Sequence, residues 1–379
     1  MTDRERPAPL VGVVDLAGRK STFGSYAAVA LGGQSALSAE LSQRLGAQGA
    51  AVARLLPPAD PDENVFHWGR WYAAAMREAL GAAGGAPVDA IGYAGAGSLA
   101  LAGDALLDDL LSPIPGEVVA NNRFSADAFV VAGDLDAALG ALVGADNDNA
   151  AVRRLEDAGF ASRDLRAAAW SRFDVDTPLD LALLRLATRL PGTRPLAAPV
   201  AGFLEMATLP GGGRLEVPHL EGLGEVIRDR AGELVVAGRV PAATLAYLET
   251  ETACRIRAFV EERGMRSARD ARPRSLLADW AQRLGPADLV VELASLGGGV
   301  ILDTRVVMAA LAGSSDAAAW PPEEERFASD FGDRARLTTP WLRELTKAAS
   351  TASVPVLLGG HALVSDGLQL LVQAAWLGR

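Results

Sequence analysis

The sequence predicts an α/β fold in two domains, and three observations lead to this prediction. Short apolar runs alternate with longer helical patterns, which is typical of a mostly parallel sheet covered by helices. The chain has 379 residues, of which 50% are hydrophobic and 22% charged, and these can supply two cores. A stretch dense in proline and glycine interrupts the alternation near residues 195–220. We therefore expect a first domain at 1–195, a linker at 196–220 and a smaller α/β domain at 221–379.

In the N-terminal part, the apolar runs and helical patterns define the expected elements. The expected strands are LVGVVDL (10–16), AVARLL (51–56), DAIGYAG (89–95), EVVAN (117–121) and DAFVVAG (127–133). The expected helices are 36–48, 71–84 and 134–144. The segment WSRFDVDTPLDLALLRL (170–186) is interpreted as a strand running into a helix. Thr177 fits the N-cap of that helix, Pro178 its first position and Asp180 its third, which together make a capping box.

The C-terminal part repeats a strand followed by a helix. Strands are expected at 233–240, 288–294, 299–305 and 354–361, and a charged amphipathic helix, structural or oligomeric in role, at 244–266. Three of the strands end in polar residues just before a helix, and these residues are Arg239, Asp303 with Arg305, and His361. Ligands bind outside the carboxyl ends of strands in open α/β sheets, so we expect these side chains to converge.

The chemistry of these strand-end residues leaves two interpretations open. Arginine suits a phosphate or carboxylate, because its guanidinium binds oxyanions with two parallel hydrogen bonds. His361 could serve as a catalytic general acid or base, or as a hydrogen-bond donor to a phosphate group. The alternative is a helix-start histidine bonded to backbone.

Composition excludes several classes of protein. The net charge of −11 argues against nucleic-acid binding, which needs clustered cations. Neither a signal peptide nor an apolar run of about 18 residues is visible, so we expect a cytoplasmic protein without a membrane span. The single Cys254 excludes an intrachain disulfide and a cysteine-cluster metal site.

Asp174 and Asp176 precede the capping box and are not explained by it. They are either solvated acids or a functional pair near a cation. The run FDVDTPLDL resembles the D-[IV]-D-T-P-x-D-L segment of GT-A-like nucleotidyltransferase domains, which include molybdenum-cofactor nucleotidyltransferases and phospholactate guanylyltransferases. LAGR (16–19), Ser21 and Phe23-Gly24 resemble the glycine-rich loop of these domains, and VALGGQSAL (29–37) the segment that follows it. The resemblance covers about residues 10–188, and the C-terminal half has none.

The resemblance implies a GT-A-like fold, with a mixed, mostly parallel sheet and flanking helices. It also implies Mg²⁺-dependent nucleotidyl transfer from an NTP to a small phosphorylated or acidic acceptor. Asp176 is the best match to the metal-holding acid and Asp174 the second, and Asp146 or Asp148 could supply a partner carboxylate. The residues expected to contact the nucleotide or the substrate are Gly18, Arg19, Lys20, Ser21, Gly24, Asn121 and Asn122.

Two positions depart from the pattern of the family. Ala28 stands where the family has a lysine, and Ser98 stands where it has a metal-binding aspartate. A neutral serine cannot replace a carboxylate on Mg²⁺, which favours charged oxygen ligands. These departures favour a second hypothesis, a catalytically inactive relative that serves as a scaffold or ligand sensor. Any chemistry would then reside near His361, Asp303 and Arg305.

Overall fold

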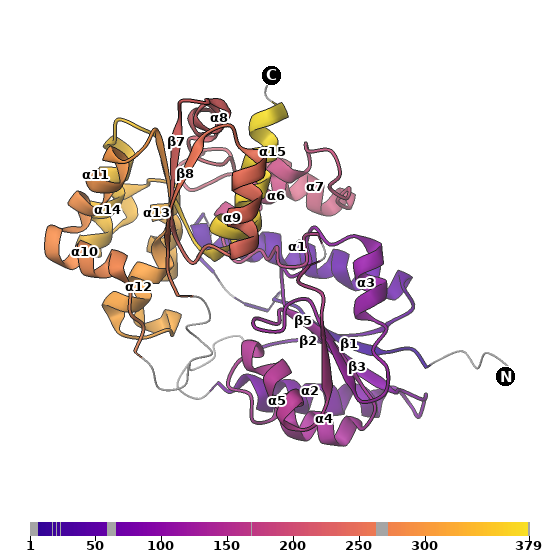
Figure 1. Cartoon of the computed structure of the whole chain (residues 1–379). Coiled ribbons are helices and arrows are strands. Elements are labelled where there is room, and N and C mark those ends of the chain that lie inside the picture. The colour runs from indigo at the N-terminus through magenta and orange to yellow at the C-terminus, as the bar shows by residue number, and fades with distance from the viewer. Residues whose placement is uncertain are drawn as a thin grey trace. The chain divides into compact units, whose positions relative to one another are not determined.

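A computed structural model describes residues 7–16, 18–19, 21–22, 24–58, 66–167, 169–262 and 272–377. The protein is α/β, with two mixed or parallel sheets flanked by helices (Figure 1). The chain forms two compact units. The first contains the chain up to Ser21, Leu31–Val175 and Leu196–Phe203, and the second contains Thr22–Ala30, Asp176–Pro195 and the chain from Leu204 onward. The units therefore differ from the consecutive domains expected from the sequence, because the chain enters the second unit twice before residue 196.

The first unit is built on a six-stranded sheet with the order β2-β1-β3-β5-β4-β6. Strand β5 is antiparallel to both of its neighbours, and the other pairs are parallel. The strands are β1 (Leu10–Val14), β2 (Ala51–Leu55), β3 (Ala90–Ala94), β4 (Glu117–Ala120), β5 (Ala128–Ala132) and β6 (Ala161–Asp164). The five expected strands are confirmed. The sequence did not predict β6, because ASRD is an edge strand without an apolar run.

Helices cover both faces of this sheet. Their bounds are α1 (Tyr26–Ala47), α2 (Trp68–Ala82), α3 (Asp104–Leu110), α4 (Leu135–Leu142), η1 (Asp148–Ala150), α5 (Ala151–Asp157) and α7 (Ala198–Met206). Successive strand residues face opposite sides. Leu10 and Val14 join the core beneath α2, α4 and α5, whereas Val11 and Val13 join the core beneath α1 and α3 (Figure 1).

The second unit has a four-stranded parallel sheet with the order β10-β9-β7-β8. Its strands are β7 (Glu233–Gly238), β8 (Arg255–Val260), β9 (Gly299–Asp303) and β10 (Val356–Gly359). From β7 the chain builds β8 on one side and then β9 and β10 on the other. The direction of winding thus reverses between β7 and β9, and this is the topological switch point where open α/β sheets bind ligands.

Helices also cover both faces of the second sheet. Their bounds are α6 (Pro178–Ala187), α8 (Leu220–Arg228), α9 (Ala242–Glu251), α10 (Leu276–Leu284), α11 (Pro286–Ser295), α12 (Thr304–Ala312), η3 (Ala317–Ala319), α13 (Glu323–Asp330), η4 (Arg334–Arg336), α14 (Pro340–Thr351), the π-helical turn η5 (Leu363–Gly367) and α15 (Leu368–Leu377). Helices α10, α11, α12 and α14 pack on one face. On the other side α8 and η5 contact the sheet, and α6 packs against α15 and η5.

Three expected elements differ from the structure. The strand expected at 288–294 is helix α11, because Gly285 and Pro286 start a helix there and Leu289, Val290 and Leu293 form its buried face. The helix expected at 244–266 ends at Glu251, and β8 follows it as a half-exposed edge strand beside β7. Arg255 and Arg257 occupy alternate positions, which is the period of a strand, whereas the charged stretch 244–266 as a whole predicts one helix. The end of that expected helix, 263–266, lies outside the described residues.

The segment before α6 is also not the strand that the sequence suggested. Residues 169–172 form turns and 173–176 run irregularly, and Trp170 adopts φ +62°. A side chain in the left-handed region is incompatible with a regular strand. The capping box after this segment is confirmed.

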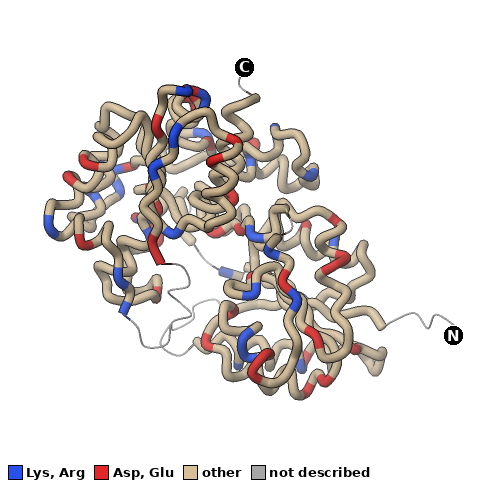
Figure 2. The backbone as a smooth tube through the Cα atoms, in the orientation of Figure 1, with Lys and Arg blue, Asp and Glu red and all other residues tan. Residues whose placement is uncertain are grey.

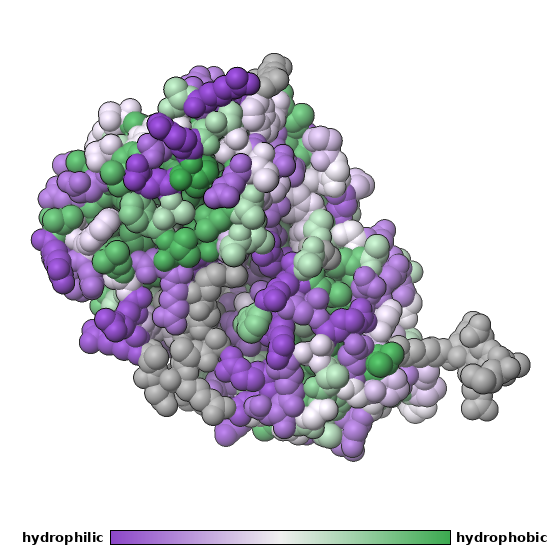
Figure 3. Space-filling model, in the orientation of Figure 1, coloured by the Kyte–Doolittle hydropathy of each residue, from purple (hydrophilic) through white to green (hydrophobic). Residues whose placement is uncertain are grey.

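The surface carries both signs of charge (Figure 2), and the face drawn in Figure 3 has an apolar area. Figure 2 shows acidic and basic residues distributed over both units. Figure 3 shows apolar side chains over the part of the second unit that carries α10, α11 and β8. Large exposed apolar residues on these elements include Val260, Leu276, Leu284 and Val291. Within the described ranges, no helix is long and apolar enough to cross a membrane.

Candidate functional site

The segment that ends at Val175 is fastened to the carboxyl edge of the first sheet. The Val175 N–H donates to the Gly97 carbonyl at 3.2 Å, and the Val175 carbonyl accepts from Gln34 Nε2 at 2.9 Å. Gly97 follows β3 with φ +88°, and a Cβ at this position would overlap the Val175 carbonyl. The close approach therefore requires glycine. It brings Asp174, the second-ranked acid of the sequence motif, to the end of β3.

Asn121 and Asn122 follow β4 and shape the neighbouring loop. Asn121 is buried, its Nδ2 donates to the Ser171 carbonyl at 3.0 Å, and its Oδ1 accepts from the Ala128 N–H at 3.0 Å. Asn122 Oδ1 accepts from the Phe124 N–H at 3.2 Å. Both carboxamides thus hold backbone. Asn121 joins Ser171 and β5 to the same sheet edge, and Asn122 holds the turn that follows it. That they contact a substrate stays a prediction.

The negative charges of three carboxylates disfavour ionisation of the Tyr93 hydroxyl, and Tyr93 lies in β3. Burial raises the pKa of Tyr93 well above its ordinary value, and the charges of Asp148, Asp127 and Asp174 raise it further. Asp148 begins η1, and Asp127 precedes the antiparallel β5, whose start lies at the carboxyl edge of its neighbours. Backbone contacts place two of these acids at the end of β3, because the Gly95 N–H donates to the Asp127 carbonyl at 2.8 Å and Val175, next to Asp174, is bound to Gly97. The sequence did not single out Asp127 or Tyr93, because nothing local marks which loops meet.

The other two acids expected at the metal are placed differently. The Asp146 side chain is 82% exposed and lies 3.4 Å from His67 Nε2. Asp176 is exposed and belongs to the second unit, where its N–H donates to Asp180 Oδ2 at 3.1 Å. Among the described residues, no group of three or more His, Cys, Asp or Glu is arranged to hold a metal ion by itself.

The expected phosphate-binding loop follows β1 at the same edge as Asp174. Gly18, Arg19, Ser21 and Gly24 are exposed, and the Arg19 N–H donates to the Leu16 carbonyl at 2.9 Å. Gly24 adopts φ +75°. Lys20, the loop's only lysine, lies outside the described residues, as do positions 17 and 23. The described residues between Gly18 and Gly24 are thus exposed.

Ser98 has a structural role in the turn after β3. The hydroxyl donates to the Gly95 carbonyl at 2.8 Å, and the residue is only 2% exposed. It is a turn residue at the position where the nucleotidyltransferase pattern has an acid.

The capping box encloses a buried carboxylate. Asp180 Oδ2 accepts from Thr177 N at 2.9 Å and Thr177 Oγ1 at 2.9 Å, and Thr177 Oγ1 accepts from Asp180 N at 3.2 Å. Burial and the charge of Asp176 raise the pKa of Asp180 to about 7, despite these hydrogen bonds, which lower it. Asp180 is therefore partly protonated near neutral pH.

At the carboxyl edge of the second sheet, Arg239 and Asp303 form a bidentate ion pair. Arg239 Nε lies 2.6 Å from Asp303 Oδ2, and Nη2 lies 3.0 Å from Oδ1. Burial would raise the pKa of the fully buried Asp303, but the charge and hydrogen bonds of Arg239 outweigh it and the pKa is lowered. The charge of His361 acts in the same direction. The expected meeting of Arg239 and Asp303 is thus confirmed, and His361 follows β10 at the same edge of the sheet.

Arg305 is engaged elsewhere. Its Nη1 donates to Asp330 Oδ1 at 2.7 Å and to Thr304 Oγ1 at 2.9 Å, and its Nη2 to Asp330 Oδ2 at 2.5 Å. Both charged side chains are buried, so Arg305 is not available to an oxyanion in this geometry. The sequence does not single out Asp330, because it lies in the strongly acidic run 321–333 and such a run is usually a solvated surface. Apolar Phe327 and Ala328, both buried, were the available sign that α13 turns one side inward.

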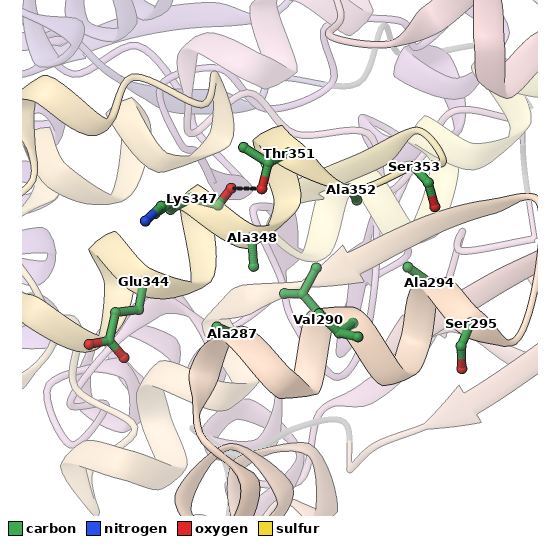
Figure 4. Close-up of a pocket in the computed structure, with 11 residues that line it drawn as sticks. Ala287, Val290, Ala294, Ser295, Glu344, Lys347, Ala348, Thr351, Ala352 and Ser353 are labelled. Carbon is green, nitrogen blue, oxygen red and sulfur yellow. Dashed lines mark hydrogen bonds between the residues drawn. The ribbon is translucent and has the colours of Figure 1, made fainter.

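A surface groove of about 550 Å³ lies between α11 and α14 (Figure 4). Val290 on α11 points toward Ala348 on α14, and small apolar residues form most of the wall. Glu344 and Lys347 lie at one end. None of the residues that the sequence nominated for chemistry line this groove.

Comparisons of the chain with known protein families, with curated proteins and with solved structures found no match.

Proposed function

We propose that the chain binds a nucleotide at the carboxyl edge of the first sheet. The observation that carries this proposal is that Val175, next to Asp174, is hydrogen-bonded to Gly97 after β3, because Asp174 belongs to the motif that resembles nucleotidyltransferases. The glycine-containing loop after β1 supports it, since exposed backbone N–H groups suit phosphate oxygens. The mixed, mostly parallel sheet is compatible with the GT-A-like domain that the resemblance implies.

Mg²⁺ would accompany the nucleotide, held by Asp174 and Asp148. Each carboxylate is oriented by the next residue, because Asp174 Oδ1 accepts from the Val175 N–H at 3.0 Å and Asp148 Oδ1 from the Asn149 N–H at 2.8 Å. Mg²⁺ is usually held by one or two carboxylates together with substrate phosphates and water. Two oriented acids fit that requirement. The ion would neutralise phosphate charge.

The activity in this proposal is nucleotidyl transfer to a small phosphorylated or acidic acceptor. An acceptor oxygen attacks the α-phosphorus, a new P–O bond forms, and the bond to the leaving pyrophosphate breaks. The side chains contribute positioning and electrostatic stabilisation.

A second candidate is a binding protein that has lost transfer. The turn role of Ser98 favours it, because this position supplies no carboxylate. Nucleotide binding is common to both candidates, and pyrophosphate release separates them.

A thermal-shift screen of the four NTPs, with and without Mg²⁺, tests the binding proposal. A hundredfold excess over Kd stabilises by about 2.7 kcal/mol, and we expect one NTP with Mg²⁺ to raise Tm by roughly 5–10 °C. Asp174→Asn and Asp148→Asn should remove most of this shift. Asp146→Asn is the matched control, since Asp146 lies in the same loop as Asp148 but is exposed. The absence of a shift with every NTP, or equal shifts in all three variants, would refute the proposal.

A further inference from the structure

The second sheet has its own switch point, and two charged residues stand at it. Arg239 directly follows β7, and Asp303 is the last residue of β9. The crevice between the carboxyl ends of two such strands is where open α/β sheets bind small molecules. This location is independent of the nucleotide proposal, which concerns the first unit.

Asp303 fixes Arg239 in one orientation. Its carboxylate accepts from Arg239 Nε, Nη2 and backbone N, the last at 3.3 Å, and from the Arg305 N–H at 3.1 Å. The Asp303 side chain is 0% exposed, whereas that of Arg239 is 18% exposed. Arg239 Nη1 has no partner among the described residues and is not enclosed. The inner edge of the guanidinium is therefore held, and its outer edge remains available for hydrogen bonding.

The backbone is built to allow this arrangement. Gly238, the last residue of β7, has φ +131°, and a Cβ there would overlap the Cβ of Asp303. Only glycine permits so close an approach. The turn η5, which contains a kink at Ser365 (φ −107°, ψ −110°), packs against β7 and β9.

We propose that this edge of the sheet binds the phosphate group of a small molecule, with Arg239 as the main contact and His361 as a second donor. A guanidinium pre-oriented by a buried carboxylate presents two adjacent N–H groups, which match two phosphate oxygens. His361 follows β10, which pairs in parallel with β9 so that Gly359 lies opposite Asp303, and this places His361 at the same edge of the sheet. The alternative is a purely structural role, in which the Arg239–Asp303 ion pair only joins β7 to β9. In that case the protein would not bind phosphate at Arg239.

The first test uses inorganic phosphate as the probe, on the full chain in EDTA. Calorimetric titration should show binding, and Arg239→Lys should raise the half-saturating concentration at least tenfold, because lysine keeps the charge beside Asp303 but loses the fork. Arg257→Gln is the matched control, since Arg257 forms an ion pair with Glu233 across β7 and β8 and is not at a strand end. Asp174→Asn should also leave phosphate binding unchanged, which separates this site from the nucleotide site. No binding, wild-type affinity in Arg239→Lys, or equal affinity for acetate would overturn the proposal.

A second test avoids variants that could misfold. Phenylglyoxal labels accessible arginines, and peptide mass spectrometry locates the label. Phosphate should slow the labelling of Arg239 severalfold and leave Arg257 unaffected. Equal labelling of Arg239 with and without saturating phosphate would contradict the proposal.

Discussion

The buried carboxylate of Asp180 predicts an unusual pH dependence of stability. Asp180 Oδ2 accepts hydrogen bonds from Asp176 N, Thr177 N and Thr177 Oγ1. The proton of the neutral carboxyl group therefore resides on Oδ1. Asparagine reproduces that neutral form, because its amide nitrogen replaces Oδ1 and its oxygen can still accept. Asp180→Asn therefore removes the ionisation while keeping the cap.

The pKa of Asp180 rises from 3.8 to about 7, chiefly through burial. The folded state then binds the proton more tightly than the unfolded state. The resulting stabilisation is fully present below pH 3.8 and is lost as pH rises through about 7. At about 1.4 kcal/mol per pKa unit, the total loss is roughly 4 kcal/mol.

Urea denaturation between pH 4 and pH 8.5, followed by circular dichroism, measures the effect. We expect the free energy of unfolding of Asp180→Asn to equal that of the wild type near pH 4. Between pH 4 and pH 7–8 it should become progressively larger than that of the wild type. Asp316→Asn is the control, because Asp316 is an exposed N-cap aspartate of the same unit. A constant difference between Asp180→Asn and the wild type from pH 4 to pH 8 would show that Asp180 ionises normally.

Three further predictions concern the second unit, each measured by urea denaturation. Gly238→Ala should destabilise by about 2 kcal/mol or more, because φ +131° and the overlap with Asp303 both oppose a side chain, and a neutral result would contradict the packing described. Asp330→Asn should cost about 3–5 kcal/mol by leaving Arg305 buried with its charge uncompensated, whereas Asp104→Asn, which breaks an ion pair whose acid is 71% exposed, should cost under about 1 kcal/mol. Thr244→Val should stabilise by about 1 kcal/mol, because the buried Thr244 hydroxyl has no partner among the described residues. Destabilisation by Thr244→Val would instead show that the hydroxyl is hydrogen-bonded.

The sequence predicts elements whose signals are local. Apolar runs identified the buried strands, and Thr177-Pro178 identified the start of α6, because capping uses neighbours within one turn. Local signals fail at edge strands such as β8, because its residues are exposed or only partly buried and need not form an apolar run. They also fail at 288–294, where a short apolar run is compatible with either strand or helix.

The sequence could not predict which charged residues form ion pairs in the two sites. The convergence of Arg239 with Asp303 followed from their common position at strand ends, and this is a topological argument. Their bidentate geometry, at a separation of 64 residues, and the pairing of Arg305 with Asp330 depend on packing. The expectation that Arg305 faces a ligand was wrong for this reason, and the same limit hid Asp127.

The position of α6 in the chain has a consequence for biosynthesis. Leu179, Leu181, Leu183 and Leu184 of this helix are buried, yet the helix packs against α15, the last helix described. On the ribosome these leucines emerge nearly two hundred residues before α15 is made. The second unit can therefore complete its core only after α15 has been synthesised, and the nascent leucine-rich segment is a natural binding site for chaperones.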